Sequence, residues 1–231
     1  MDKIISDTIR RINGIDLISL DTDDKFVYIT PTLSTDECFE LFNNMTEEVF
    51  ENYSHLLDKT TLMVHLFPPE VLNTSGHTLD KKPEGHHKFY ILDKIILKTG
   101  TLTLCKIEFI EFGTTYNWWY FKHVNWKHYG DTIRNKFLSN GITPTNEWVL
   151  NYMTKDATMP KHVDAILPYI RYCFSIRQPV TEASIIINEE KFYIPEGTAY
   201  IMDGEIPHEI IHKSADPRIM MIGAIDYRGN L

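Results

Sequence analysis

Apolar and polar residues alternate over short stretches in the second half of the chain, and turn residues separate these stretches. Alternating or continuously apolar segments occur at 148–153, 170–176, 184–188, 198–202 and 219–227. A period of two places successive side chains on opposite faces of a strand. Residues 188–190 can turn a hairpin into a further strand at 191–194, and residues 195–197 form another turn. About eight short strands at close spacing predict a sandwich or a barrel.

The first half of the chain combines strand and helix patterns. Residues 25–30 alternate as a strand does. Ser34 to Glu37 have the sequence of a capping box, which predicts a helix from there to about Tyr53. The apolar face of this helix is formed by Cys38, Leu41, Phe42, Met45 and Val49.

Residues 73–112 favour a loop followed by strands. Residues 73–88 contain two glycines, a proline and three histidines, and this composition predicts a loop. Three apolar segments follow at 89–92, 95–97 and 102–110. They indicate strands, and a helix is an alternative for the first two.

Residues 116–129 are unusually rich in aromatic side chains, with three tryptophans, three tyrosines and one phenylalanine. One interpretation is a wall that faces a substrate. The favoured interpretation is a hydrophobic layer that packs the first part of the chain onto the second, because aromatic residues dominate the burial of cores.

Composition limits the class of protein. The 231 residues are 43% hydrophobic and 24% charged, which is typical of a globular chain and excludes disordered and collagen-like classes. This length fits one large domain, or a domain with a substantial extension. The net charge of −9 argues against nucleic acid or an anionic membrane as a partner.

The cysteines and the N-terminal residues point to the cytoplasm. Cys38, Cys105 and Cys173 are too few and too scattered for a disulfide framework or a zinc finger, and we expect buried thiols. Residues 1–12 are charged throughout and lack the apolar core of a signal peptide. No run approaches the roughly 20 apolar residues that span a bilayer. We therefore expect a cytoplasmic protein without a membrane partner.

Two histidines and an aspartate have the spacing of a metal site. On a strand, His162 and Asp164 project to the same face, and His208 follows 46 residues after His162. Two imidazoles and one carboxylate can occupy one face of an ion, as in the facial triad of non-heme Fe(II) oxygenases, and Mn, Co, Ni and Zn are also possible. Arg218 lies ten residues after His208 and could hold an anionic co-substrate.

Residues 148–231 resemble the core of the Fe(II)/2-oxoglutarate-dependent oxygenases, in the aspartyl/asparaginyl β-hydroxylase branch. The matching segments are 159–164, Arg171, 195–197, 201–209 and 216–218. The resemblance implies a mainly β fold with flanking helices, in which a double-stranded β-helix (jelly-roll, cupin-like) core follows an α+β extension. We divide the chain into an extension at 1–130, which packs on the core, and the core itself at 131–231.

The resemblance also implies roles for single residues. The residues that it places on iron are His162, Asp164 and His208. It pairs Arg218 with the distal carboxylate of 2-oxoglutarate, makes Arg171 a second anion contact, and aligns Asn151 with a polar residue at the start of the core. Two roles are open for Asp203: it orients His208, or it caps a turn. His212 is expected at a solvent-facing or rim position. The other histidines that lack a partner pattern, at 86, 87, 123 and 128, are expected to be structural or exposed.

The activity implied by the resemblance is a hydroxylation that uses Fe(II), 2-oxoglutarate and O2. The substrate would be an unactivated C–H bond of an amino-acid side chain, free or within a peptide or protein, and the products would include succinate and CO2. Two alternatives remain open: a cupin-type metal enzyme that does not use 2-oxoglutarate, and a non-catalytic cupin-like binding module. The sequence leaves the oligomeric state undetermined.

Overall fold

A computed structural model describes ten segments of the chain: residues 9–12, 15–19, 26–29, 34–66, 87–139, 144–164, 170–179, 184–187, 189–202 and 207–225. Most of the loop predicted at 73–88 lies outside these residues.

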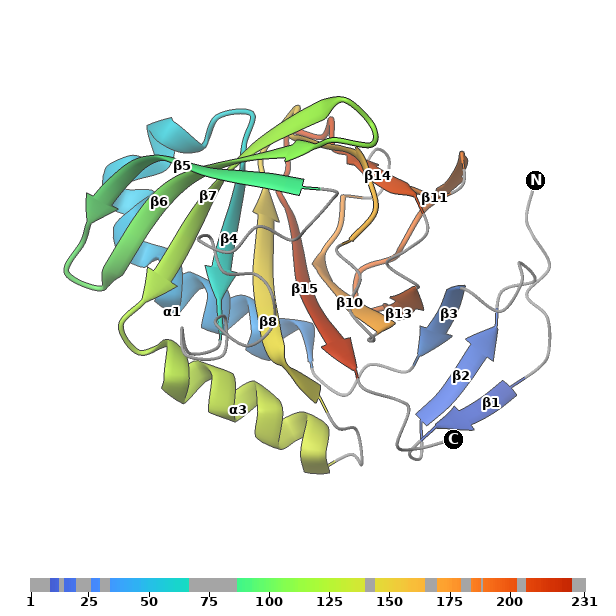
Figure 1. Ribbon diagram of the computed structural model, residues 1–231. Helices are drawn as coiled ribbons and strands as arrows, with labels where there is room; N and C mark the ends of the chain where they lie inside the picture. Colours follow the sequence, from blue (N-terminus) through green and yellow to red (C-terminus); the bar gives the residue numbers. More distant parts are fainter. Residues whose placement is uncertain are drawn as a thin grey trace.

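Two β-sheets form the second half of the protein (Figure 1). Successive strands alternate between them, except for the hairpin of β11 and β12, which lies within the smaller sheet. The strands are β8 (Pro144–Met153), β9 (Thr158–His162), β10 (Ile170–Arg177), β11 (Ser184–Ile187), β12 (Glu190–Phe192), β13 (Ala199–Met202), β14 (His208–Ile211) and β15 (Arg218–Ile225). The larger sheet contains the order β13-β10-β15-β8, and the smaller sheet has the order β12-β11-β14-β9. This arrangement is the double-stranded β-helix of jelly-roll proteins, so the predicted fold class is confirmed.

Strands from the first half of the chain extend the larger sheet on both sides. Beyond β8 the sheet continues through β4 (Thr61–His65), β7 (Thr114–His123), β6 (Gly100–Phe109) and β5 (His87–Ile96). Beyond β13 it continues through β3 (Phe26–Ile29), β2 (Ile15–Ser19) and β1 (Ile9–Ile12). The pair β4 and β7 is parallel, whereas β4 and β8 are antiparallel. One sheet thus runs through both predicted parts, and the division at residue 130 stays a prediction.

Helix α1 (Thr35–Tyr53) begins at the predicted capping box. Ser34 Oγ accepts a hydrogen bond from the backbone N–H of Glu37, and the Glu37 side chain accepts one from the backbone N–H of Ser34. These contacts satisfy two amides that a helix start otherwise leaves without partners. A short 3-10 helix (Ser54–Leu57) follows.

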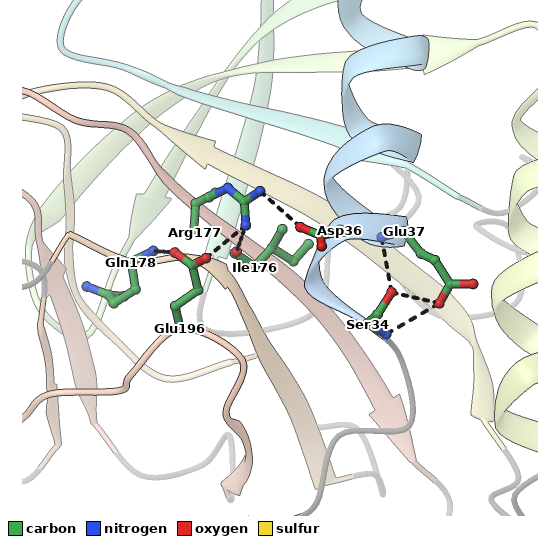
Figure 2. Close-up of polar contacts among 7 residues, drawn as sticks. All are labelled: Ser34, Asp36, Glu37, Ile176, Arg177, Gln178 and Glu196. Carbon is green, nitrogen blue, oxygen red and sulfur yellow. Dashed lines mark hydrogen bonds and ion pairs between the residues drawn. The ribbon is translucent and has the colours of Figure 1, made fainter.

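Arg177, in the last position of β10, ties the start of α1 to the larger sheet (Figure 2). Its guanidinium lies 2.8 Å from Glu196 and 3.5 Å from Asp36. It also lies over the ring of Phe39, 4.1 Å from the ring centroid. A planar cation suits this combination of carboxylates and an aromatic face.

A second helix, α3 (Trp126–Ser139), begins inside the aromatic segment and had no clear signal in the sequence. Trp, Tyr, Thr and Gly are poor helix formers, so local propensity does not favour it. Its buried Ile133 belongs to the same apolar cluster as the buried residues of α1. Tertiary packing, rather than local helix propensity, therefore stabilises α3.

The larger sheet has two buried faces with different neighbours. Its outer face packs against the helices, and includes Leu62, Val64, Trp119, Phe121, Leu150 and Met221. Its inner face packs against the smaller sheet, and includes Cys105, Tyr116, Trp118, Met153, Cys173 and Met220. Alternate residues of β7 face the helices and the interior, as expected for a hydrophobic packing layer. The alternative interpretation, a wall that faces a substrate, stays a prediction. The interior is the side on which the predicted site lies.

Candidate metal centre

His162 and His208 occupy directly paired positions on neighbouring strands. They are partners in the antiparallel pairing of β9 with β14, at the end of β9 and the start of β14. Both side chains are buried, and their ring centroids lie 4.3 Å apart. Side chains of directly opposite residues share one face of a sheet, so the strand register alone brings the two imidazoles together.

Asp164 supplies a carboxylate to the same place. It follows β9 by two residues, and its Oδ1 lies 3.9 Å from Nε2 of His162. One ligand atom from each of His162, Asp164 and His208 lies within 4.8 Å of the other two. The Asp164 side chain is 22% exposed against 6% for His162, so the carboxylate side of the group is the more open one. Two imidazoles and a carboxylate at this separation fit a divalent transition metal.

A backbone carbonyl fixes the tautomer of His162. Its Nδ1 lies 2.7 Å from the carbonyl oxygen of Pro160. Because a carbonyl only accepts, Nδ1 carries the proton and Nε2 keeps its lone pair. Metal-binding histidines have such a partner on the ring nitrogen that does not bind the ion.

The first half of the chain contributes a wall to this centre. Phe109, the last residue of β6, stacks on His162 with ring centroids 4.7 Å apart. Thr114, the first residue of β7, donates a hydrogen bond through Oγ1 to the carbonyl of Lys161 at 3.4 Å. The turn between β6 and β7 therefore lies on β9, beside the paired histidines. The sequence did not single out Phe109, because nothing in the local pattern relates residue 109 to residue 162.

Arg218 is buried in the interior at the start of β15, with 1% of its surface exposed. Its Nη1 lies 3.6 Å from the sulfur of Met153, and the Tyr200 hydroxyl is a hydrogen-bonding neighbour. Its Nε has no hydrogen-bond partner among the described residues. Burial lowers the pKa of Arg218, since removal from water disfavours the charged form. No carboxylate of the described segments lies at ion-pair distance from this cation.

Asn151 lies on the central strand β8 and is fully buried. It pairs with Met220 of β15, two residues beyond Arg218, and so shares the inner face with Arg218. Neither its amide nitrogen nor its amide oxygen has a hydrogen-bond partner in the described part of the chain. Buried amides are normally paired, so these atoms mark a place for a polar group of a ligand or a water.

The remaining predicted residues have different outcomes. Arg171 lies on β10, where its backbone pairs with Met202 and Ala224, and its side chain is outside the described residues. Asp203 also lies outside them. The prediction for His212 is wrong: it is fully buried rather than at a rim. It continues the alternation in which His208 and Ile210 of β14 are buried, and its amide donates to the carbonyl of Ala157.

Known proteins provide a family match for the site region. Residues 127–226 match the family model of aspartyl/asparaginyl beta-hydroxylase, which confirms the resemblance found in the sequence. The matched region contains all six residues predicted for the metal and the co-substrate. It supports a hydroxylase of the cupin type. No curated protein sequence matches the chain.

Solved structures with similarity to the chain include small cupin domains. A conserved protein of unknown function from Streptococcus pyogenes has 18% identity and a TM-score of 0.28, over 35% of this chain and 63% of its own. The polyketide cyclase RemF from Streptomyces resistomycificus has 9% identity and a TM-score of 0.29, over 34% and 53%. A Cupin_2 domain of an XRE family transcriptional regulator from Enterobacter cloacae has 16% identity and a TM-score of 0.30, over 35% and 80%. The first two are thus matched over less than two thirds of their length.

None of the helices in the described segments is long and apolar enough to cross a membrane.

Proposed function

We propose that this chain, whose residues 127–226 match the aspartyl/asparaginyl beta-hydroxylase family, is an Fe(II)- and 2-oxoglutarate-dependent dioxygenase. It hydroxylates an unactivated C–H bond of an amino-acid side chain, free or within a peptide or protein, and releases succinate and CO2. The family match supports the hydroxylation, and the donor set of the candidate metal centre supports iron.

Three side chains would hold the metal: His162, Asp164 and His208. Iron bound by such a set supplies the activation of O2 for attack on a C–H bond. The protein orients the ligands, since the Pro160 carbonyl holds the His162 ring and the strand register positions His208. Phe109 covers the His162 ring and keeps water from that side.

The single observation that carries the 2-oxoglutarate requirement is the burial of Arg218 without a carboxylate of the described segments at ion-pair distance. A buried ion that lacks a counter-ion costs several kcal/mol, so a buried guanidinium indicates an anionic ligand. A guanidinium binds a carboxylate through two parallel hydrogen bonds, and 2-oxoglutarate carries a carboxylate at the end away from its metal-chelating group. Asn151, with both amide atoms free of partners among the described residues, is a second contact in this interior.

We place the reaction in the cytoplasm, where Fe(II) and free thiols persist. The three cysteines are free and buried. Burial raises the pKa of Cys38 to about 12 and that of Cys105 to about 11, so neither thiol competes as a reactive thiolate at neutral pH.

Succinate formation tests the proposal. The protein is purified without oxygen, loaded with Fe(II), and given 2-oxoglutarate and O2 with panels of amino acids and peptides. We expect succinate in amounts equal to the substrate that gains one oxygen atom by mass spectrometry. The His208→Ala variant is the matched inactive control.

Calorimetry and the succinate assay together distinguish the proposed enzyme from the two alternatives. With Mn(II) in place of iron, the proposed enzyme binds 2-oxoglutarate without turnover. A cupin enzyme of another kind would bind metal and not 2-oxoglutarate. A non-catalytic module would form no succinate with any substrate. Absence of both succinate and 2-oxoglutarate binding would overturn the proposal.

A further inference from the structure

We infer that two hydroxyl groups from the first half of the chain, those of Thr61 on β4 and Tyr116 on β7, complete the pocket in which Arg218 receives the distal carboxylate of 2-oxoglutarate. Both residues lie outside the segment that matches the hydroxylase family, residues 127–226. The inference rests on the proposed function and names further residues that bind the co-substrate.

Thr61 and Arg218 flank the same residue on the inner face. Met153 of β8 is the direct partner of Arg218 on one side and of Thr61 on the other. Two strand spacings separate the Thr61 and Arg218 backbones, roughly 10 Å. The long arginine side chain crosses part of this distance, because its Nη1 lies 3.6 Å from the Met153 sulfur. The guanidinium therefore lies over β8, toward Thr61.

Tyr116 approaches the same place from β7. The parallel register pairs Leu62 with Trp119, so Thr61 is level with Trp118, and Tyr116 is its diagonal neighbour. Aromatic side chains reach across such a diagonal. Tyr116 stacks on Trp118, with ring centroids 5.5 Å apart, in the cluster that lines the interior.

The ionisation of Tyr116 shows which groups are close to it. Burial raises the pKa of the Tyr116 phenol, while the Thr61 hydroxyl and the charge of Arg218 oppose that rise. The phenol therefore keeps its proton at neutral pH and can donate a hydrogen bond. The Thr61 and Tyr116 hydroxyls are neighbours, and neither has a hydrogen-bond partner of regular geometry among the described residues.

Both hydroxyls are buried without a hydrogen-bond partner among the described residues. Thr61 is fully buried and Tyr116 is 7% exposed. The buried Thr46, in contrast, donates a hydrogen bond to the carbonyl of Phe42 at 2.7 Å. A buried hydroxyl that lacks a hydrogen bond destabilises the folded protein. Two of them beside a buried cation indicate a ligand that accepts hydrogen bonds.

A carboxylate matches this set of donors. Its two oxygens offer about four sites for hydrogen bonds. A bidentate guanidinium uses two of these sites and leaves two open. Thr61 and Tyr116 provide one hydroxyl donor each, so the three side chains together saturate one carboxylate.

The test compares two ligands on the Mn(II)-loaded full chain by calorimetry without oxygen. 2-Oxoglutarate carries the distal carboxylate, whereas oxalate can chelate the metal and lacks it. Thr61→Val and Tyr116→Phe remove one hydroxyl each at nearly constant volume. The matched controls are Tyr152→Phe, on the outer face of β8 against Phe42, and Thr115→Val, exposed beside Tyr116.

We expect each inner-face variant to raise the Kd of 2-oxoglutarate about tenfold, since hydrogen bonds to charged groups are the strong ones. The Kd of oxalate stays within about twofold of wild type, because the metal end is unchanged, and both controls bind like wild type. Equal weakening of both ligands would assign Thr61 and Tyr116 a structural role and overturn the inference.

Unchanged 2-oxoglutarate affinity in Thr61→Val and Tyr116→Phe would also overturn it, with the proposed function left standing. A wild-type protein that binds oxalate but no 2-oxoglutarate would instead overturn the proposed function, and the inference with it.

Discussion

The ring of Phe109 on β6 stacks on the imidazole of His162 on β9, with centroids 4.7 Å apart and planes inclined by 29°. Phe109 precedes the segment that matches the hydroxylase family, and His162 lies within it. The candidate centre is therefore built from both halves of the chain. The β6–β7 hairpin acts as a wall of the site as well as an extension of the sheet.

This contact predicts that Phe109→Leu weakens metal binding. Leucine fills most of the space but gives up the stacking that holds the His162 ring. We expect about a tenfold loss of Mn(II) affinity, as for other changes of groups that orient a metal ligand. The matched control is Phe121→Leu, a buried change on the outer face of β7, which should bind Mn(II) like wild type. Equal Mn(II) affinities of Phe109→Leu and Phe121→Leu would contradict the role of Phe109 in orienting His162.

Single substitutions of the proposed ligands test the centre itself. His162→Ala, Asp164→Ala and His208→Ala should each lower the affinity for Mn(II) or Co(II) by about a hundredfold or more, because each removes one of three protein ligands. His55→Ala and His128→Ala change exposed histidines and serve as controls. The visible spectrum of the Co(II) protein reports coordination directly. A wild-type spectrum in any of the three ligand variants would exclude that residue from the centre.

Local sequence patterns were sufficient to predict those helices and strands that depend on interactions between residues close in the sequence. Ser34 and Glu37 cap α1 by contacts three residues apart. Short alternating or apolar segments predicted the strands β8, β10, β11, β12, β13 and β15. The grouping of His162, Asp164 and His208 was also predictable. His162 and Asp164 are two residues apart, at and just after the end of β9, and the family resemblance supplied His208.

Pairings between distant segments were not predictable from the sequence. β4 (Thr61–His65) pairs with β7 and β8, which follow it by about fifty and eighty residues. Helix α3 has poor helix formers and depends on packing. The stacking of Phe109 on His162 exists only because the larger sheet runs through both halves of the chain. The burial of His212 was misjudged, because burial depends on the packing of the whole fold.

His123 predicts a pH dependence of stability. Burial lowers its pKa below the ordinary 6.5, against a smaller opposite effect of Glu48, and its Nδ1 accepts a hydrogen bond from the Asn125 amide. The unfolded chain binds the proton more readily, so folding stability from His123 is present above pH 6.5 and is lost as the pH falls through the lowered pKa.

The melting temperatures of wild type and His123→Asn test this dependence between pH 7.5 and 5. Asparagine keeps an acceptor for the Asn125 amide but does not titrate. We expect wild type to be the more stable at pH 7.5, because its ring also contacts Phe121 and Tyr129, and the difference to narrow as the pH falls below 6.5. The exposed His128→Asn is the control. A difference that stays constant with pH would contradict a buried neutral His123.

Arg218 predicts a conflict between stability and function. A buried cation among neutral groups destabilises the protein when no anion is bound, because it has lost its hydration without gaining a counter-ion. Arg218→Met replaces the guanidinium with an apolar side chain that can pack against Met153 and the inner face. We expect the variant to be more stable than wild type by about 1 to 3 kcal/mol in the absence of ligand.

The Arg218→Met variant should also bind 2-oxoglutarate much more weakly than wild type. Without the guanidinium, the Kd of the Mn(II) protein rises by at least about a hundredfold, since a charge-assisted bidentate contact is gone. The melting temperature of wild type increases with 2-oxoglutarate concentration, and that of Arg218→Met does not. Arg177→Met is the control: it removes a cation that has carboxylate partners, so it should be less stable than wild type and should still bind 2-oxoglutarate. If Arg218→Met were destabilised like Arg177→Met, Arg218 would be a structural residue with its own counter-ion, and the anion pocket would lose its basis.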